Sequence, residues 1–158
     1  MSAADCAEVA VLEEEEPGGW SRKTLQAYPE QVGVVYCCKV VTIDDRIVGY
    51  LIGRGIADEM EIHRLVVVKQ WRRQGIGHRL LQDFFACMKM HGIRSCFLEV
   101  RSRNDAALSF YENEGFYRCG FRRRYYENPD DDALVFRKDL AFLKDGDTAK
   151  TNTMVMGL

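Results

Sequence analysis

The stretch from Leu65 to His78 most constrains the fold, because an apolar strand, a glycine turn and an amphipathic helix follow one another without a break. Gly75 and Gly77 allow backbone conformations closed to other residues, and they bring backbone N–H groups close to a ligand. The helix that follows adds the positive end of its dipole. Hydrogen bonds from such groups to charged oxygens contribute about 1.5 to 3 kcal/mol each. The stretch therefore predicts a site for an anionic cofactor.

The glycine spacing excludes two common phosphate-binding motifs. A dinucleotide-binding fold requires GxGxxG after an early strand, and a P-loop requires GxxxxGK followed by Ser or Thr. The chain instead has Arg72-x-x-Gly75-x-Gly77. Taken alone, this pattern also fits a helix entry in which Gly gives clearance and Arg gives solubility.

Length and composition predict one cytoplasmic domain. The 158 residues are 47% apolar, which is enough for a substantial core. A net charge of -2 argues against a nucleic-acid partner. The six cysteines show neither a CxxC pair nor a His at zinc-ligand spacing, so we expect no metal site and buried thiols in a reducing compartment. No leader and no apolar run long enough to cross a membrane is visible.

Hydrophobic periodicity and turn residues predict a mixed α/β chain in which strands outnumber helices. A hairpin is expected at Asp44-Asp45, and Asn104 is expected to cap a helix. This order favours a mixed sheet with helices on both faces. The predicted helices cover residues 5–16, 21–28, 76–90 and 104–114, and the predicted strands cover residues 34–43, 46–54, 59–68, 95–101, 116–126 and 133–138.

Three further segments make the glycine pattern more specific. Residues 97–116 contain LEVR-x-x-N-x-x-A-x-x-x-Y-E-x-x-GF, residues 122–126 read RRxYY, and Pro17 with residues 20–24 forms a PWS-x-KT-like loop. With RxxGxG, these blocks resemble the GCN5-related N-acetyltransferase (GNAT) superfamily, and in particular its RimI type, the ribosomal-protein alanine N-acetyltransferases. The matches span residues 17–138.

The resemblance implies a GNAT fold, a mixed, mostly antiparallel twisted sheet flanked by helices. Family members begin with a strand before the first helix, and only Met1 to Ala4 precede the predicted helix here, so we expect that strand to be absent or truncated. We place one acetyltransferase domain at residues 1–140. Residues 141–158 carry little periodic apolar content and are predicted to be a disordered tail.

The resemblance also assigns roles by position. Acetyl-CoA is the implied cosubstrate, and the acceptor is a protein N-terminus, with a monomer or weak dimer expected. Glu99 would be the general base and Tyr111 the general acid, while Pro17, Trp20, Tyr125 and Tyr126 would frame the acceptor. The implied cofactor-binding residues are Leu65, Val66, Val67, Arg72, Arg73, Gln74, Gly75, Ile76, Gly77, His78 and Asn104.

Each assignment has a simpler structural alternative. Glu99 could be a solvated strand carboxylate, Tyr111 a core aromatic, and Asn104 only a helix cap. The run Glu13 to Glu16 is typical of a solvated helix end, although it could attract a basic protein tail. Two other functions stay open: acetylation of a small amine such as a polyamine or aminoglycoside, and acyl-CoA binding without turnover.

Overall fold

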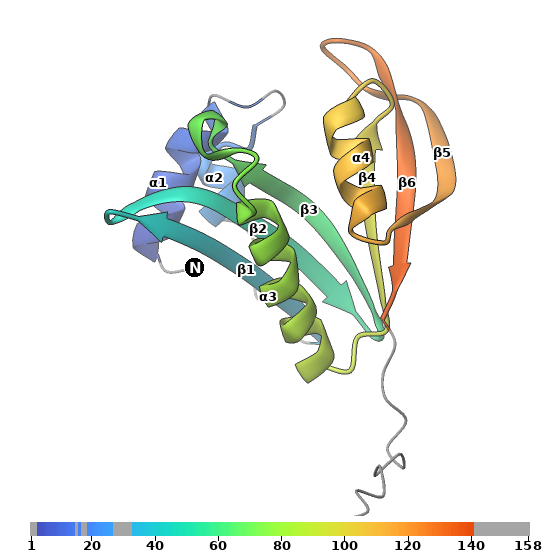
Figure 1. Ribbon diagram of the computed structural model, residues 1–158, viewed down its shortest axis with the longest axis horizontal. Coiled ribbons are helices and arrows are strands. Elements are labelled where there is room, and N and C mark those ends of the chain that lie inside the picture. The colour runs from blue at the N-terminus through green and yellow to red at the C-terminus, as the bar shows by residue number, and fades with distance from the viewer. Residues whose placement is uncertain (1–2, 15, 17–18, 27–32, 141–158) are drawn as a thin grey trace, which may run out of the picture.

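The computed structural model describes residues 3–14, 16, 19–26 and 33–140, and it shows one twisted sheet with helices on both faces (Figure 1). The elements are α1 (Ala3–Glu14), α2 (Arg22–Gln26), β1 (Val34–Ile43), β2 (Arg46–Ile56), β3 (Glu59–Val67), a short 3-10 helix η1 (Lys69–Trp71), α3 (Ile76–Met90), β4 (Ser95–Arg101), α4 (Asp105–Asn113), β5 (Tyr117–Tyr126) and β6 (Asp131–Asp139).

The sheet has six strands in the order β1-β2-β3-β4-β6-β5. Every neighbouring pair is antiparallel except β3 and β4, which run parallel. This confirms the predicted mixed and mostly antiparallel sheet. The described residues begin at Ala3 with α1, so the expectation of a missing or truncated first strand stays a prediction.

The β1–β2 hairpin follows from its turn residues. Asp44 and Asp45 have φ angles of 49° and 59°, and this left-handed pair matches the right-handed twist of the flanking strands. Aspartate tolerates the left-handed region better than most side chains because its short carboxylate can bond the local backbone. The predicted hairpin is therefore confirmed.

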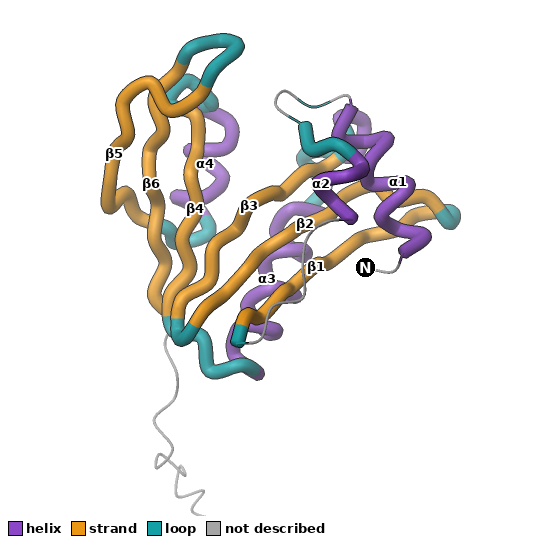
Figure 2. Tube along the Cα trace, turned by 180° about the vertical axis from the view of Figure 1, so that it is seen from behind, coloured by secondary structure: helices purple, strands orange, loops and turns teal. Residues whose placement is uncertain are grey.

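Two apolar clusters cover opposite faces of the sheet (Figure 2). On one face, α3 presents a helical stripe that includes Leu80, Leu81, Phe84 and Met88, all fully buried against the strands. The cluster on this face extends to Tyr111 of α4. On the other face, Val9 of α1 and Leu25 of α2 belong to the second cluster. The expectation of helices on both faces is confirmed.

Several boundaries differ from the predictions. Helix α1 begins and ends two residues earlier than expected, and α2 begins one residue after Ser21, whose Oγ accepts the backbone N–H of Thr24 over 3.1 Å. Strand β6 is longer than predicted because it pairs on both sides, and the Asp131 carboxylate at its start accepts the Ser102 hydroxyl.

Some expectations are corrected or fall outside the description. The thiol of Cys119 is exposed, so the cysteines are not uniformly buried as predicted. The end of the predicted second helix at residues 27–28 and the predicted tail at 141–158 lie outside the described residues. Among the helices that are described, none combines the length and apolar character needed to cross a membrane.

Candidate active site

A slot opens in the middle of the sheet where β3 and β4 separate. Their parallel pairing covers only four positions, from Glu59 with Ser95 to Ile62 with Leu98. Beyond that point the two strands diverge, as both ribbon views show (Figures 1 and 2). Opposite this divergence, β2 and β3 shift register so that His63 lies between the pairs Ile52–Arg64 and Gly53–Ile62. Such bulges bend a strand and re-aim side chains next to functional sites.

A cavity of about 520 Å³ lies beside the slot, bounded by the end of β3, the glycine loop and α4; we call it the loop cavity. It lies within the size range of small-molecule sites.

One predicted cofactor-binding residue, Gln74, is not part of the lining of the loop cavity. Its side-chain amide donates to the Gln70 carbonyl over 3.2 Å. The lining includes the other ten, namely Leu65, Val66, Val67, Arg72, Arg73, Gly75, Ile76, Gly77, His78 and Asn104.

The glycine loop has the backbone geometry that its sequence predicts. Gly75 has a φ of 80° and forms the N-cap of α3 without a side chain to satisfy the first helical N–H groups. Arg73 also has a positive φ, of 64°. A Cβ at Gly77 would come within 3.2 Å of the Phe110 ring, so glycine there lets α3 and α4 approach each other. The loop thus presents the donor end of a helix to the cavity, as an anionic group requires.

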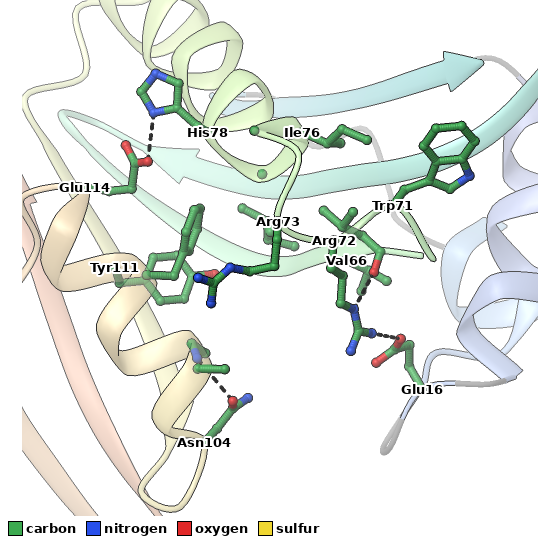
Figure 3. Close-up of a pocket in the computed structure, with 17 residues that line it drawn as sticks. Glu16, Val66, Trp71, Arg72, Arg73, Ile76, His78, Asn104, Tyr111 and Glu114 are labelled. Atoms are coloured by element: carbon green, nitrogen blue, oxygen red, sulfur yellow. Dashed lines mark hydrogen bonds and ion pairs between the residues drawn. The ribbon is translucent and has the colours of Figure 1, made fainter. Parts of the chain in front are cut away.

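Two polar side chains of the loop cavity bind other side chains across it (Figure 3). Arg72 donates from Nε to the Val67 carbonyl over 2.8 Å and from Nη2 to the Glu16 carboxylate over 3.0 Å. His78 Nδ1 lies 2.8 Å from Oε1 of Glu114. The first pair links the glycine loop to the segment after α1, and the second links the start of α3 to the end of α4.

Glu99 lies on the slot side of β4. Its neighbours Leu98 and Val100 are buried, as the predicted strand alternation requires, whereas the Glu99 side chain is 13% exposed. Its Oε1 pairs with Arg122 Nε of β5 at 2.9 Å. A hydrogen bond to Glu99 also raises the pKa of Tyr125. Glu99 is therefore not a fully solvated carboxylate on the surface of a strand.

Glu99 borders two cavities. One of about 340 Å³, the slot cavity, runs between β3 and β4 to Asn104, Tyr111 and Tyr126. The other, of about 420 Å³, the outer cavity, is lined by residues that include Arg54, Glu61 and His63. Glu99, Leu98 and His63 line both cavities, so the two cavities lie next to each other at Glu99.

Tyr111 is on α4 at the junction of the loop and slot cavities. The Phe110 and Phe116 rings lie edge-on to its ring, with centroids 5.1 and 5.5 Å away. Burial raises the pKa of the Tyr111 hydroxyl. The residue is therefore both a core aromatic and a phenol that keeps its proton at neutral pH.

The predicted acceptor residues are distributed around the slot. Burial raises the pKa of Tyr126 to about 12, and its ring carries the Arg101 guanidinium 4.3 Å above its centroid. Tyr126 lines the slot cavity, and Tyr125 packs edge-on against it at 5.1 Å. The Trp20 ring lies edge-on to His63 at 5.9 Å. His63 lines the slot cavity, whereas Trp20 and Tyr125 are not part of its lining. Pro17 lies outside the described residues.

Sequence reasoning missed the role of Glu13. The predicted solvated run is wrong at this position, because the Glu13 side chain is fully buried and bound to Arg64 Nη2 at 2.5 Å. The Tyr50 hydroxyl and the backbone N–H of Trp20 also donate to it. No local signal distinguishes Glu13 from its glutamate neighbours, since Arg64 lies 51 residues away.

Asn104 performs its predicted capping role, and its Oδ1 accepts the Ala107 N–H over 3.1 Å. The cap fixes the start of α4 at the point where the loop and slot cavities meet. Gly115, with a φ of 82°, ends the same helix. Both ends of the helix that carries Tyr111 are thus set by local chemistry.

Comparison with known proteins identifies this arrangement. The model of the acetyltransferase (GNAT) family matches residues 7–121. The chain belongs to this family. It is an acetyl-CoA-dependent N-acetyltransferase with the GNAT fold, as the sequence predicts. The residues around the glycine loop fit this cosubstrate, because exposed helical N–H groups suit a pyrophosphate and the loop cavity leads from them to Tyr111.

Two curated relatives and one solved structure are named as N-acetyltransferases. The chain is 32% identical over 118 residues to the ribosomal protein bS18-alanine N-acetyltransferase of Salmonella typhimurium, covering 73% of this chain and 78% of the relative. It is 39% identical over 97 residues to the N-alpha-acetyltransferase RimI of Mycobacterium tuberculosis, covering 59% of this chain and 60% of the relative. The solved Escherichia coli ribosomal-protein-S18-alanine N-acetyltransferase has the same fold, with a TM-score of 0.80, 24% identity and coverage of 92% and 94%.

We predict that Gly75→Ala weakens acetyl-CoA binding by about tenfold or more, because a methyl group would stand in the open space of the loop and strain its left-handed backbone. Gly92→Ala is the matched control. Gly92 also has a positive φ and open space around it, but it lies after α3 and outside the loop cavity. Titration calorimetry should show the affinity loss in Gly75→Ala alone. Equal acetyl-CoA affinities for the two variants would contradict the assignment of the loop.

Proposed function

We propose that this enzyme transfers the acetyl group of acetyl-CoA to the α-amino group of a protein N-terminus, and that the acceptor is an N-terminal alanine of a small-subunit ribosomal protein. The observation that carries the proposal is the continuity of the loop and slot cavities. A cosubstrate in one and an acceptor amine in the other would meet beside Tyr111. The two cavities share Glu16, Leu65, Val66, Asn104, Ala107 and Tyr111.

The relatives support this choice of acceptor. The Salmonella typhimurium relative is named for ribosomal protein bS18 and alanine, and the Mycobacterium tuberculosis relative for α-amino acetylation. In this chain the slot cavity has an aromatic wall at Tyr126 and a carboxylate at Glu99. Such a wall suits an extended peptide end better than a small polyamine, because rings pack against the peptide and a hydroxyl can bind its backbone.

An α-amine also suits the chemistry of the slot. The pKa of a protein α-amino group is near 8 and that of a lysine amine near 10.4, so at pH 7 the α-amine has a few hundred times more free base, as an order of magnitude. A mild base is then sufficient. Glu99, directly or through a water molecule, takes one proton from the acceptor ammonium and releases it to solvent, which leaves the neutral amine as the nucleophile. A carboxylate has about four acceptor sites, so its contacts with Arg122 and Tyr125 leave capacity for the acceptor.

In the proposed step, the free amine attacks the thioester carbonyl and forms a C–N bond, and the nitrogen then gives its second proton to Glu99. The C–S bond then breaks, and the departing thiolate takes the proton of the Tyr111 hydroxyl, which solvent later restores. Burial keeps that proton on Tyr111 until it is needed. We assign the role of holding the carbonyl oxygen, as it becomes negative, to a backbone N–H of β3 near Val67.

The acceptor class is tested with a panel of acetyl acceptors. We expect thiol release from acetyl-CoA with peptides that begin with alanine, and lower kcat/KM with peptides that begin with other residues. Peptides with a blocked N-terminus and a free lysine should give little product, because their amine is protonated and must enter on a long side chain. Faster turnover of spermidine or an aminoglycoside would favour a small-amine enzyme, and no thiol release with any acceptor would favour a binding module.

The Glu99→Gln variant should lower kcat by about 10² to 10⁴-fold and leave the acetyl-CoA dissociation constant unchanged. Glutamine keeps the size of the side chain but cannot accept the proton. Glu112→Gln on the exposed part of α4 is the control and should retain wild-type turnover. A Glu99→Gln enzyme with wild-type kcat at every pH from 6 to 9 would remove Glu99 from the mechanism.

Tyr111→Phe should reduce kcat by about 10²-fold or more, because the ring packing is kept and only the proton donor is lost. Tyr117→Phe provides the comparison, since this exposed tyrosine hydrogen-bonds Asp139 away from the slot. Acetyl donors with better leaving thiols separate the two explanations: a thioester of a more acidic thiol should restore part of the rate in Tyr111→Phe. Failure of such a thioester to restore any rate would argue that Tyr111 only packs.

A further inference from the structure

Arg72 connects the glycine loop to the acceptor side of the slot. Its guanidinium spans from the Val67 carbonyl at the end of β3 to the Glu16 carboxylate, with the two contacts at 2.8 and 3.0 Å (Figure 3). Glu16 and Arg72 are 56 residues apart in the chain. The Glu16 side chain is 26% exposed and lines both the loop and the slot cavity. A charged group of the cofactor loop is therefore bound to the wall of the acceptor cavity.

Glu16 is also the centre of the turn that leads to Trp20. Its backbone N–H donates to the Glu13 carbonyl over 3.2 Å, and its own carbonyl accepts the Gly19 N–H over 3.0 Å. A Cβ at Gly19 would fall 1.8 Å from the Glu13 carbonyl oxygen, so the turn closes tightly on the end of α1. Glu16 thus binds the N–H of Gly19, and the next residue, Trp20, donates its own N–H to Glu13 and contacts His63 with its ring.

The two glutamates of this turn are held in different ways. Glu13 is fully buried and is bound to Arg64 and Tyr50, which belong to the same side of the sheet as α1. That anchor does not depend on the cofactor loop. The Glu16–Arg72 pair is partly exposed on both sides, at 26% and 49%, and is therefore the adjustable contact.

We propose that Arg72 is a positioning residue that couples the two substrates. Through Glu16 it holds the turn before Trp20 in place, and with it the side of the slot cavity that Glu16 lines, which we call the acceptor wall. When acetyl-CoA orders the glycine loop, it therefore also orders the acceptor wall. This inference rests on the proposed function in one respect, which is that the acceptor is taken to bind in the slot cavity beside this wall. Because such coupling is reciprocal, each substrate strengthens the binding of the other by the same factor. Arg72 then differs from Arg73, whose side chain projects into the loop cavity in Figure 3.

The first test needs no acceptor. Amide hydrogen exchange of the segment around Gly19 and Trp20 is measured with and without saturating coenzyme A. In the wild type we expect coenzyme A to slow this exchange at least threefold. Glu16→Gln should remove the slowing while coenzyme A still binds, and Glu14→Gln, an exposed neighbour in the same acidic run, should preserve it. Slowing that persists in Glu16→Gln, or that is absent in the wild type, would overturn the coupling.

The second test uses steady-state kinetics with the best acceptor from the panel. Glu16→Gln should raise the acceptor KM at saturating acetyl-CoA about fivefold and the acetyl-CoA KM at saturating acceptor by about the same factor. The dissociation constant of coenzyme A measured without acceptor should change by less than twofold, a pattern that general loss of structure would not produce. Arg72→Gln should raise the acceptor KM by at least as much, and the double variant should be no worse than Arg72→Gln alone. If the two substitutions raise the acceptor KM independently, so that their effects multiply in the double variant, the proposed coupling through the Glu16–Arg72 pair is refuted.

The two tests separate this inference from the proposed function. If coenzyme A slows exchange at Gly19 in the wild type and not in Glu16→Gln, but no peptide is acetylated, the coupling stands and the protein-acceptor assignment fails. If peptides are acetylated and Glu16→Gln has the wild-type acceptor KM, the assignment stands and the coupling fails.

Discussion

The early end of the β3–β4 pairing is the constraint on which the site depends. After four parallel pairs the two strands diverge, and the backbone groups along the facing edges need other partners. The Val67 carbonyl takes the Arg72 guanidinium. A cosubstrate and an acceptor are themselves chains of amide groups, so a slot between two strand edges is suited to receive both. The glycine loop, α4 and the acceptor wall are all arranged around this opening.

Local chemistry explains why much of the fold could be predicted. Asp44 and Asp45 specify a hairpin by their tolerance of left-handed backbone, and Asn104 specifies a helix start by accepting the Ala107 N–H. The alternation of Leu98, Glu99 and Val100 placed the carboxylate on the less buried side of β4. Each of these features depends on residues within a few positions of one another, and such signals are readable in the sequence. The GNAT resemblance then supplied the identity of the family.

Long-range pairing explains what could not be predicted. Glu13 and Glu16 belong to one run of four glutamates that resembles a solvated helix end, yet Glu13 is buried beneath Arg64. Glu16 pairs with Arg72. The partners are more than fifty residues away, and only the packing of α1 against β2 and β3 brings them together. The same holds for Arg72 itself: its motif predicted a cofactor-binding residue, and no local signal indicated that it also connects Val67 to Glu16.

The proposed mechanism places its two proton carriers in different surroundings. Tyr111 is enclosed by Phe110 and Phe116, and burial raises the pKa of its hydroxyl, so it retains a proton to give. Glu99 lies where the slot cavity adjoins the outer cavity, where a proton taken from the acceptor can leave toward solvent. Because β4 carries Glu99 and α4 carries Tyr111, the distance between the two groups is set by the Asn104 cap that joins these elements.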